Sequence, residues 1–324
     1  MMTIGITRMV DTTGGRADLG GGGLAPIAAG ARSYRTAARG RLTRWGLTVV
    51  ALSGLGGTVL SVQETASISM NRVVTRLTEG QPVVGTFSRV PDPAVDFSVI
   101  DAQYGEFDPE SIRQDLNNLR VDAPPRLAPV VRIPYDARAA PDAAVDAVLE
   151  AGALGVMFPD IETPEQARTA IAAMRYRMVS DTGDGGAVGQ RDSGVGTAAR
   201  YWGLSDDAYR ARADVWPLHP SGALVAMLQI ESRMGVERVN EILDIPGIGV
   251  IFLGPTDLAR SIGADGPDAP EVETLVQRVL RACLARDIAC GYPIVAPTPE
   301  EAERQTARRL REGFMVLAVM TLSQ

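Results

Sequence analysis

Several polar residues stand at or just beyond the ends of short apolar segments, where they could act together in chemistry. They are Asp101, Arg132, Gln229, Glu231 and Asp257. Glu231 and Asp257 could hold a hard divalent cation such as Mg²⁺ or Mn²⁺ and leave positions for substrate oxygens and water. Arg132 could donate hydrogen bonds to an enolate or a carboxylate. The alternative is that these acids and the arginine pair with one another and bind nothing.

The residues that the chain lacks exclude several other mechanisms. All 32 residues counted as Lys plus Arg are Arg, which excludes a Schiff-base aldolase, a pyridoxal phosphate enzyme and a P-loop phosphate site with its lysine. With one histidine, His219, an imidazole-rich metal site is excluded too, and a bound metal must be held by oxygen. Cys283 and Cys290 are too few for a disulfide framework, and we expect both to be buried apolar residues.

The apolar segments predict the elements that position these residues. Eight short segments carry apolar residues on consecutive positions, as strands buried on both faces do. They are 83–87, 97–101, 128–133, 155–159, 224–231, 250–255, 288–295 and 314–319. Helical segments alternate with them; Thr163 and Thr298 are placed to begin helices, and Gly152 and Gly313 to end them. Eight such alternations over about 250 residues predict an α/β fold, a TIM (β/α)8 barrel, with a doubly wound open sheet as the alternative.

The predicted barrel departs from the regular pattern near its first strand and after its last. Only residues 88–96 connect the first two strands, and Pro91 and Pro93 leave little room for a helix there. Five residues follow the last predicted strand, which ends at Val319, so we expect the barrel to lack its final helix. In a TIM barrel the active site lies at the carboxyl ends of the strands, so the polar residues above should converge at one mouth.

The first 69 residues predict a leader that precedes a barrel domain of residues 70–324. Residues 1–44 are rich in Gly, Ala, Thr and Arg, and the stretch 45–62 is apolar and carries no charge. A basic flank before an uncharged stretch is typical of a secretory signal peptide or a membrane anchor, so we expect export to the periplasm and membrane contact only through the leader. The alternative is translation from Met70, which would leave a cytoplasmic enzyme.

Charge is distributed unevenly between the leader and the body of the chain. The formal net charge is -7, but residues 1–66 hold seven Arg and three acids, whereas the remainder holds 25 Arg and 36 acids. An acidic body argues against nucleic acid as a partner.

Three segments resemble those of a known protein family. They are Pro129–Pro134, Gln229–Ser232 and Gly254–Leu258, and they resemble the characteristic segments of the HpcH/HpaI aldolase family, which is related to the citrate lyase β-type enzymes. The resemblance extends over the globular part, from Met70 to Val319. Segments 199–204 and 212–218 further resemble a subset of that family whose members often carry export signals.

The resemblance implies a metal-dependent aldolase of class II. In the family, the acids matching Glu231 and Asp257 hold a divalent metal (Mg²⁺ or Mn²⁺, with Co²⁺ as a further option) that chelates pyruvate, and the arginine matching Arg132 stabilises the pyruvate enolate. Cleavage of a carbon–carbon bond then releases an aldehyde. The substrate-binding residues that the resemblance implies are Gln229, Gly254 and Pro255. It also implies a small-molecule 2-oxo acid and an aldehyde as partners, and assembly as a homo-oligomer.

One segment departs from the family pattern. Where the family carries acid-x-Glu-His after the second strand, this chain has Asp101-Ala102-Gln103-Tyr104. The histidine taken as the family's general base is therefore Tyr104, a phenol whose ordinary pKa of about 10 makes it a poor base near neutral pH. Asp101 is retained, and we expect it to assist proton transfer. His219 lies in a proline-bounded loop before the fifth strand, where we expect it to be solvated.

Three functions follow as hypotheses. The leading one is a metal-dependent carbon–carbon lyase, an aldolase that acts on a 2-oxo acid through a pyruvate enolate. The second is a degenerate family member that binds metal or a 2-oxo acid with little catalysis, which Gln103, Tyr104 and the expected lack of the last helix all favour. The third, a CoA-ester lyase of the same superfamily, is less favoured because no basic stretch suggests a site for nucleotide phosphates.

Overall fold

The computed structural model describes residues 70–104, 107–120, 126–177 and 189–322. The chain divides into two units, residues 1–63 and 64–324, and every described residue belongs to the second. The predicted leader 1–69, with its apolar stretch 45–62, lies outside the described residues. Within the described ranges, no helix combines the length and the apolar character that crossing a membrane requires.

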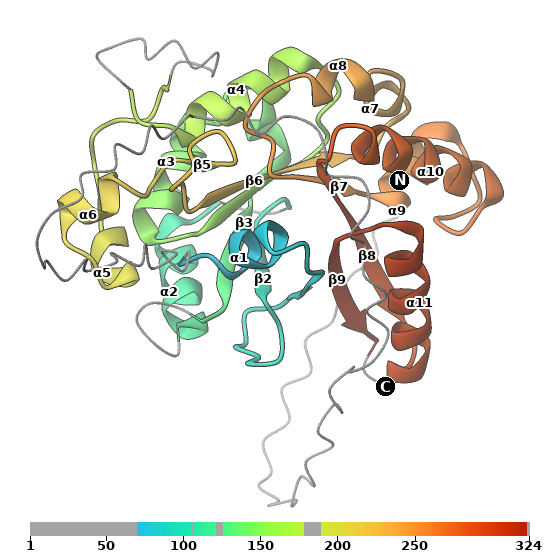
Figure 1. Cartoon of the computed structure of the whole chain (residues 1–324), viewed down its shortest axis with the longest axis horizontal. Helices are drawn as coiled ribbons and strands as arrows, with labels where there is room; N and C mark the ends of the chain where they lie inside the picture. Colours follow the sequence, from blue (N-terminus) through green and yellow to red (C-terminus); the bar gives the residue numbers. More distant parts are fainter. Residues whose placement is uncertain (1–69, 105–106, 121–125, 178–188, 323–324) are drawn as a thin grey trace, which may run out of the picture. The chain divides into compact units, whose positions relative to one another are not determined.

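Eight parallel strands form a closed barrel (Figure 1). The ring follows the order β1, β2, β3, β4, β6, β7, β8 and β9, and β9 pairs back to β1. The strands are β1 Val83–Phe87, β2 Phe97–Asp101, β3 Ala128–Arg132, β4 Gly155–Phe158, β6 Leu224–Ile230, β7 Val250–Leu253, β8 Ala289–Ala296 and β9 Val316–Thr321. The predicted TIM barrel is confirmed, and the alternative of an open doubly wound sheet is wrong.

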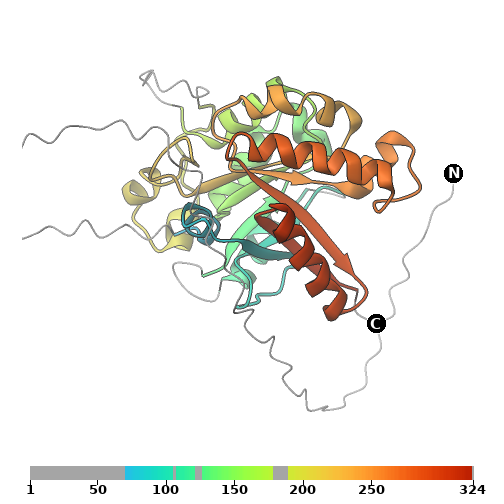
Figure 2. The same cartoon turned by 45° about the vertical axis from the view of Figure 1, so that its right-hand side comes forward.

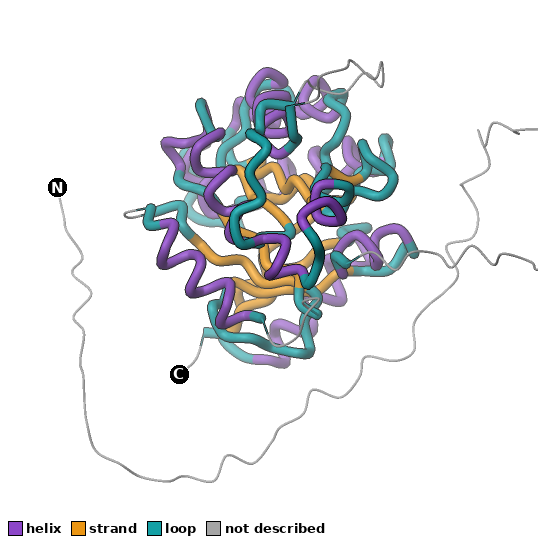
Figure 3. The backbone as a smooth tube through the Cα atoms, turned by 90° about the vertical axis from the view of Figure 1, so that its left-hand side faces the viewer, coloured by secondary structure: helices purple, strands orange, loops and turns teal. Residues whose placement is uncertain are grey.

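Helices cover the outside of the ring, as Figures 2 and 3 show. The helices of the described part are α1 Arg72–Thr78, α2 Pro109–Leu119, the 3-10 helix η1 Tyr135–Ala139, α3 Asp142–Ala151, α4 Pro164–Met174, α5 Ala198–Trp202, α6 Asp206–Arg210, α7 Arg233–Glu237, α8 Val239–Leu243, α9 Pro255–Ile262, α10 Pro270–Leu284 and α11 Pro299–Glu312. Two of them differ in place: Asn71, which caps α1, binds the carbonyls just before β4 and β6, at the amino end of the ring, and η1 lies at the carboxyl end. The predicted caps are present. Thr163 forms a capping box with Gln166 at the start of α4, and Thr298 caps α11. Gly152 and Gly313 end α3 and α11 with φ of 118° and 113°, in the left-handed region that favours glycine.

The strands form the core of the molecule. Every residue of β4, β6 and β7 is buried, which confirms that these strands are covered on both faces. Cys283 and Cys290 are buried and unpaired, as predicted. The structure adds one strand that the sequence pattern did not predict, β5 Val215–Trp216, which pairs with β6 outside the ring.

The connection between β1 and β2 contains no helix, as its two prolines predict. Arg89 in this connection donates from Nη2 to the carbonyl oxygen of Asp101 at 3.2 Å and forms an ion pair with Asp115 of α2. A loop side chain therefore reaches the end of β2. At the other end of the barrel domain, the described residues stop at Leu322, directly after β9, so the expected lack of a final helix stays a prediction.

Candidate active site

The barrel brings the five polar residues predicted from the sequence to the same end of the ring. Asp101 and Arg132 are the last residues of β2 and β3 and are register partners. Gln229 is the penultimate residue of β6, and Glu231 follows β6 directly. Asp257 lies in the first turn of α9, which begins two residues after β7 ends. Because all the strands of the ring are parallel, these carboxyl ends form one mouth.

Glu231 is a buried carboxylate that two hydrogen bonds fix in place. The residue is 3% exposed. The backbone N–H of Asp160 donates to Oε1 at 2.9 Å, and Gln229 Nε2 donates to Oε2 at 3.1 Å. Burial, and after it the negative charge of Asp257, raises the pKa of Glu231 to about 7. The negative charge of Asp257 therefore acts on Glu231, and a cation bound by both acids would offset their repulsion.

Gly254 leaves space for the Glu231 carboxylate because it has no side chain. A Cβ atom at position 254 would lie 2.1 Å from Glu231 Oε2, which is closer than any non-bonded contact allows. Pro255 then begins α9 as its first residue, where the fixed φ of proline suits a helix start and a missing N–H costs nothing. The Gly-Pro pair therefore sets how closely the start of α9, with Asp257, approaches Glu231.

Two buried amide oxygens at this mouth lack a hydrogen-bond donor. Gln229 and Gln103 are 2% and 5% exposed, and the Oε1 atom of each has no partner in the described part of the chain. A buried acceptor without a donor is costly, so these oxygens mark positions where a ligand or water would bind.

The oxygen set at the mouth suits a divalent cation. The carboxylates of Glu231 and Asp257, with the unpaired amide oxygen of Gln229, are the hard donors that Mg²⁺ and Mn²⁺ prefer. No cluster of three or more His, Cys, Asp or Glu that could hold a metal occurs among the residues that the structure describes. A cation here would therefore be held by two acids, and other oxygens would complete its shell.

Arg132 is held by Asp101 on the neighbouring strand. Its Nε donates to Asp101 Oδ1 at 2.8 Å, and its Nη2 donates to Oδ2. The guanidinium also lies 5.0 Å from the centre of the Phe87 ring. Burial raises the pKa of Asp101, but the paired Arg132 outweighs it, so the pKa lies below its ordinary value. The acid–arginine pairing weighed from the sequence is therefore present for these two residues. Asp257 likewise pairs with Arg260 of α9 at 2.6 Å, whereas Glu231 accepts no hydrogen bond from an arginine among the described residues.

Tyr104 lies at the mouth with most of its surface in solvent. The residue is 68% exposed. Its limited burial, together with the charges of Asp257 and Glu231, raises the pKa of the phenol above its ordinary value. The hydroxyl therefore keeps its proton near neutral pH, which suits a hydrogen-bond donor or proton donor rather than a base.

The structure adds Asp160 to the residues at the mouth. It follows β4 by two positions, is 8% exposed and has a φ of 48°, which is uncommon for a residue other than glycine. Its backbone N–H binds Glu231, as described above. The rule that identified the other acids, a polar residue just after a predicted strand, would have identified Asp160 as well, because the predicted strand 155–159 ends directly before it.

His219 does not reach this mouth. It lies in the loop between β5 and β6, which leads into the amino end of β6, opposite to the end that carries Gln229. Its Nδ1 lies 3.1 Å from Ser221 Oγ in an exposed position. This agrees with a solvated loop histidine.

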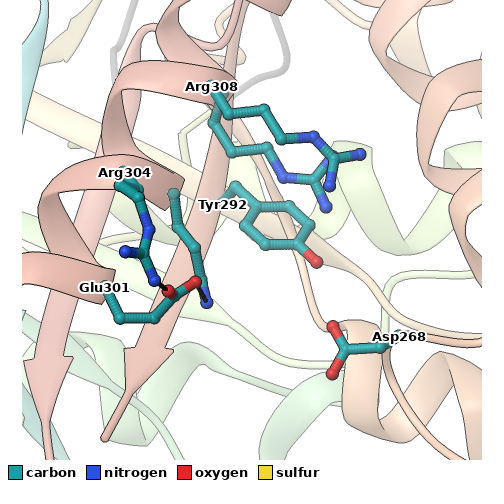
Figure 4. Close-up of a pocket in the computed structure, with 7 residues that line it drawn as sticks. Asp268, Tyr292, Glu301, Arg304 and Arg308 are labelled. Carbon is teal, nitrogen blue, oxygen red and sulfur yellow. Dashed lines mark hydrogen bonds and ion pairs between the residues drawn. The ribbon is translucent and has the colours of Figure 1, made fainter. Parts of the chain in front are cut away.

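A separate cavity of about 210 Å³ lies between α11, β8 and the loop before α10 (Figure 4). Tyr292 and Asp268 face each other across it, and α11 contributes Arg304 and Arg308. The arginines already pair with carboxylates of their own helix, Arg304 with Glu301 and Arg308 with Glu312. None of the residues predicted from the sequence lines this cavity.

Comparison with known proteins matches a large part of this chain to one family. The family model described as HpcH/HpaI aldolase/citrate lyase matches residues 106–315. A 2-keto-3-deoxy-L-rhamnonate aldolase of Klebsiella pneumoniae subsp. pneumoniae is 32% identical over 198 residues, which cover 61% of this chain and 67% of that enzyme. The enzyme of the same name from Salmonella schwarzengrund is 34% identical over 219 residues, which cover 67% of this chain and 73% of the relative.

A solved structure agrees with this match. The crystal structure of an HpcH/HpaI aldolase/citrate lyase family protein from Burkholderia cenocepacia J2315 superposes with a TM-score of 0.61 and 27% sequence identity. The superposition covers 78% of this chain and 93% of that protein.

Proposed function

Because the chain belongs to the HpcH/HpaI aldolase/citrate lyase family, we propose that it is a carbon–carbon lyase of the class II aldolase type that acts on a 2-oxo acid. The observation that carries the proposal is the buried Glu231 carboxylate at the carboxyl end of β6, whose pKa burial and the negative charge of Asp257 raise. The relatives named as 2-keto-3-deoxy-L-rhamnonate aldolases favour a 2-oxo sugar acid as the substrate class. Pyruvate would be the three-carbon fragment that such a cleavage leaves.

Glu231 and Asp257 are the residues that would hold the divalent metal, which we propose to be Mg²⁺, Mn²⁺ or Co²⁺. When bound, such an ion supplies a Lewis acid that polarises a ketone oxygen and so favours enolate formation. The lack of Lys in the chain agrees with this role, because no amine is available to form a Schiff base instead. The unpaired Oε1 of Gln229 is placed to orient substrate or water beside the two acids.

Arg132 is the residue that we assign to the enolate. Asp101 uses the Nε and Nη2 donors of the guanidinium and fixes its plane, and Nη1 makes no hydrogen bond within the described part of the chain. A guanidinium held in this way can donate to an oxygen that gains negative charge without first reorganising, which is how fixed donors lower a reaction barrier. Because the paired Asp101 stays ionised near neutral pH, it can accept a proton from a group nearby but has none to donate.

Tyr104 is the residue that we assign to proton donation during bond cleavage or formation. A raised pKa keeps its hydroxyl protonated, so it cannot replace the histidine of the family as a general base. This observation also favours a second candidate function, a family member that binds metal and a 2-oxo acid but turns over slowly. The two candidates share the metal site and differ only in how fast a proton moves.

Proton exchange at pyruvate tests the proposal. Full-length protein is incubated with pyruvate in deuterated water, with Mn²⁺ or Mg²⁺ or with a chelator, and the methyl signal is followed by proton NMR after the metal is removed. We expect metal-dependent loss of the signal, which Glu231→Ala and Asp257→Ala abolish. Glu303→Ala, at an exposed position of α11, is the matched control and should behave as the wild type. Undiminished exchange in Glu231→Ala would contradict the metal assignment.

A further inference from the structure

Three residues form a second polar cluster at the barrel mouth, beside Glu231. The hydroxyl of Tyr135 donates to Asp160 Oδ2 at 3.0 Å, and Arg138 Nη1 lies 3.2 Å from the same oxygen. The Arg138 guanidinium also stacks on the Tyr135 ring, 4.1 Å from the ring centre. Two side chains of η1 therefore hold one carboxylate oxygen of Asp160, and we call this cluster of Tyr135, Arg138 and Asp160 the aspartate clamp.

The backbone of Asp160 has the conformation that directs its N–H at Glu231. With a φ of 48°, Asp160 is in the left-handed region. Its N–H donates to Glu231 Oε1 at 2.9 Å, and the next N–H, of Ile161, donates to the carbonyl of Gln229 at 2.9 Å. Two consecutive N–H groups thus bind the end of β6. A left-handed conformation of a residue other than glycine persists only where its surroundings hold it, and Asp tolerates it better than most residues.

Glu231 depends on this contact for its orientation. Its two carboxylate oxygens each accept one hydrogen bond from the described residues, Oε1 from Asp160 and Oε2 from Gln229. Gly254 leaves space for Oε2 but offers no donor to it. If the donor at Oε1 moved away, the carboxylate could rotate about its last torsion.

We propose that the aspartate clamp positions Glu231 for the divalent cation, with Asp160 as the positioning residue and Tyr135 and Arg138 holding it in place. This inference rests on the proposed function, because the position of Glu231 matters in this way only if Glu231 is a metal ligand. It adds contacts around Glu231 that were not among the residues predicted from the sequence. Groups that orient metal ligands typically change metal affinity by about 10- to 100-fold when they are removed.

Substitutions at Asp160 distinguish two explanations: that its side chain holds the backbone in place, or that its negative charge alone affects Glu231. Asp160→Asn removes the negative charge but keeps an acceptor for Tyr135 and a side chain that tolerates the left-handed region. Asp160→Ala removes the charge and the acceptor and leaves a Cβ atom in a strained conformation. If the clamp acts by holding the backbone, the Asn variant stays close to the wild type and the Ala variant does not. If the carboxylate acts through its charge, the two variants are equally weak.

The experiment measures Mn²⁺ binding to the full chain by the electron paramagnetic resonance signal of free Mn²⁺. We expect Asp160→Ala and Tyr135→Phe to bind Mn²⁺ about tenfold more weakly than the wild type, and Asp160→Asn to remain near it. Adding Tyr135→Phe to Asp160→Ala should cause no further loss, because both changes break the same contact. Tyr176→Phe is the matched control: its hydroxyl donates to the carbonyl of Gly194 at 3.0 Å, away from the mouth, and its loss should not affect Mn²⁺ binding.

The outcomes separate this inference from the proposed function. If the wild type binds Mn²⁺ and Glu231→Ala does not, while Asp160→Ala and Tyr135→Phe bind as the wild type does, the clamp is refuted and the metal site stands. Equal weakening by Asp160→Asn and Asp160→Ala refutes the clamp as well. If Glu231→Ala binds as the wild type does, the metal assignment fails and the clamp with it. Unfolding curves in chelator show whether Asp160→Ala still folds; if it does not, Tyr135→Phe and Asp160→Asn decide.

Discussion

Asp101 and Arg132 end adjacent strands in register and bind each other through both carboxylate oxygens of the aspartate. The pair belongs to the β2–β3 side of the mouth, whereas Glu231 and Asp257 follow β6 and β7. Asp257 accepts a hydrogen bond from Arg260 of its own helix at 2.6 Å, whereas Glu231 accepts none from an arginine within the described residues. The two pairs of residues lie on different strands and can be substituted separately.

Asp101→Asn should slow proton exchange without weakening metal binding. The variant keeps an oxygen for Arg132 but loses the charge that fixes the guanidinium and the group that can accept a proton. We expect the rate of pyruvate exchange to fall by about 100-fold, the scale of a lost acid–base group. The Kd for Mn²⁺ should stay at the wild-type value. Asp207→Asn is the control, because the Asp207 side chain is fully exposed on α6. If Asp101→Asn lost Mn²⁺ affinity together with exchange activity, Asp101 would be a metal ligand.

Gly254→Ala should damage the metal site through a single methyl group. The added Cβ would lie 2.1 Å from Glu231 Oε2, so the carboxylate must move. We expect Mn²⁺ to bind at least about tenfold more weakly, as for other changes that disturb a metal ligand. Gly266→Ala is the matched control, because its Cβ would meet nothing within 4 Å. Wild-type Mn²⁺ affinity in Gly254→Ala would mean that Glu231 does not need its present position.

Tyr104→His decides between the two candidate functions. An imidazole with a pKa of about 6.5 can accept a proton near neutral pH, which the phenol cannot, and a restored base is worth about 100-fold or more. A gain of that size in retro-aldol cleavage of a 2-oxo sugar acid is expected if the site is a slow lyase. Tyr104→Phe measures how much the hydroxyl itself contributes to the cleavage rate. No gain in Tyr104→His would favour binding without catalysis.

Asp146→Asn should change how stability depends on pH. Burial raises the pKa of Asp146 to about 6, although Arg191 lies 4.0 Å away and opposes the shift. Because the pKa is higher in the folded chain than the value of about 3.9 in the unfolded chain, this group stabilises the fold at low pH, and the contribution is lost as pH rises through about 6. A neutral Asn does not titrate.

The measurement is thermal unfolding of the wild type and Asp146→Asn at pH 4.5 and pH 7.5, values chosen on either side of the pKa of about 6. The variant should gain stability relative to the wild type at the higher pH, on the order of 1 kcal/mol after allowance for partial exposure. An Asn variant that loses stability at the higher pH would show that the attraction to Arg191 outweighs burial.

Much of the barrel could be predicted because its strands carry an unambiguous pattern. The predicted strand 224–231 corresponds closely to β6 Leu224–Ile230. Seven buried residues in succession are typical of a strand that is covered on both faces. The two-residue β5 could not be predicted, because no periodicity exists over Val215 and Trp216. The observed strand ends differ from the predicted ones where a neighbouring element sets the boundary. The last strand begins at Val316 rather than at residue 314, beyond the turn in which Gly313 ends α11.

The candidate site was predictable as a set of residues but not as a set of contacts. A strand-end rule placed Asp101, Arg132, Glu231 and Asp257 at one mouth, and the barrel confirms that placement. Whether Arg132 would pair with an acid or stay unpaired depends on the register of β2 and β3, which the sequence does not state. The role of Asp160 depends on a backbone angle, and a positive φ leaves no mark in a sequence when the residue is not glycine.

The helix-free connection between β1 and β2 offers a practical use. Val90, near its middle, is 70% exposed, and residues 88–96 have no covering helix that an insertion would displace. A fluorophore or an affinity tag attached at Val90 would sit beside the mouth, because Arg89 already reaches the end of β2. Such a label would report ligand entry at close range while leaving the hydrogen-bonded ring of strands intact.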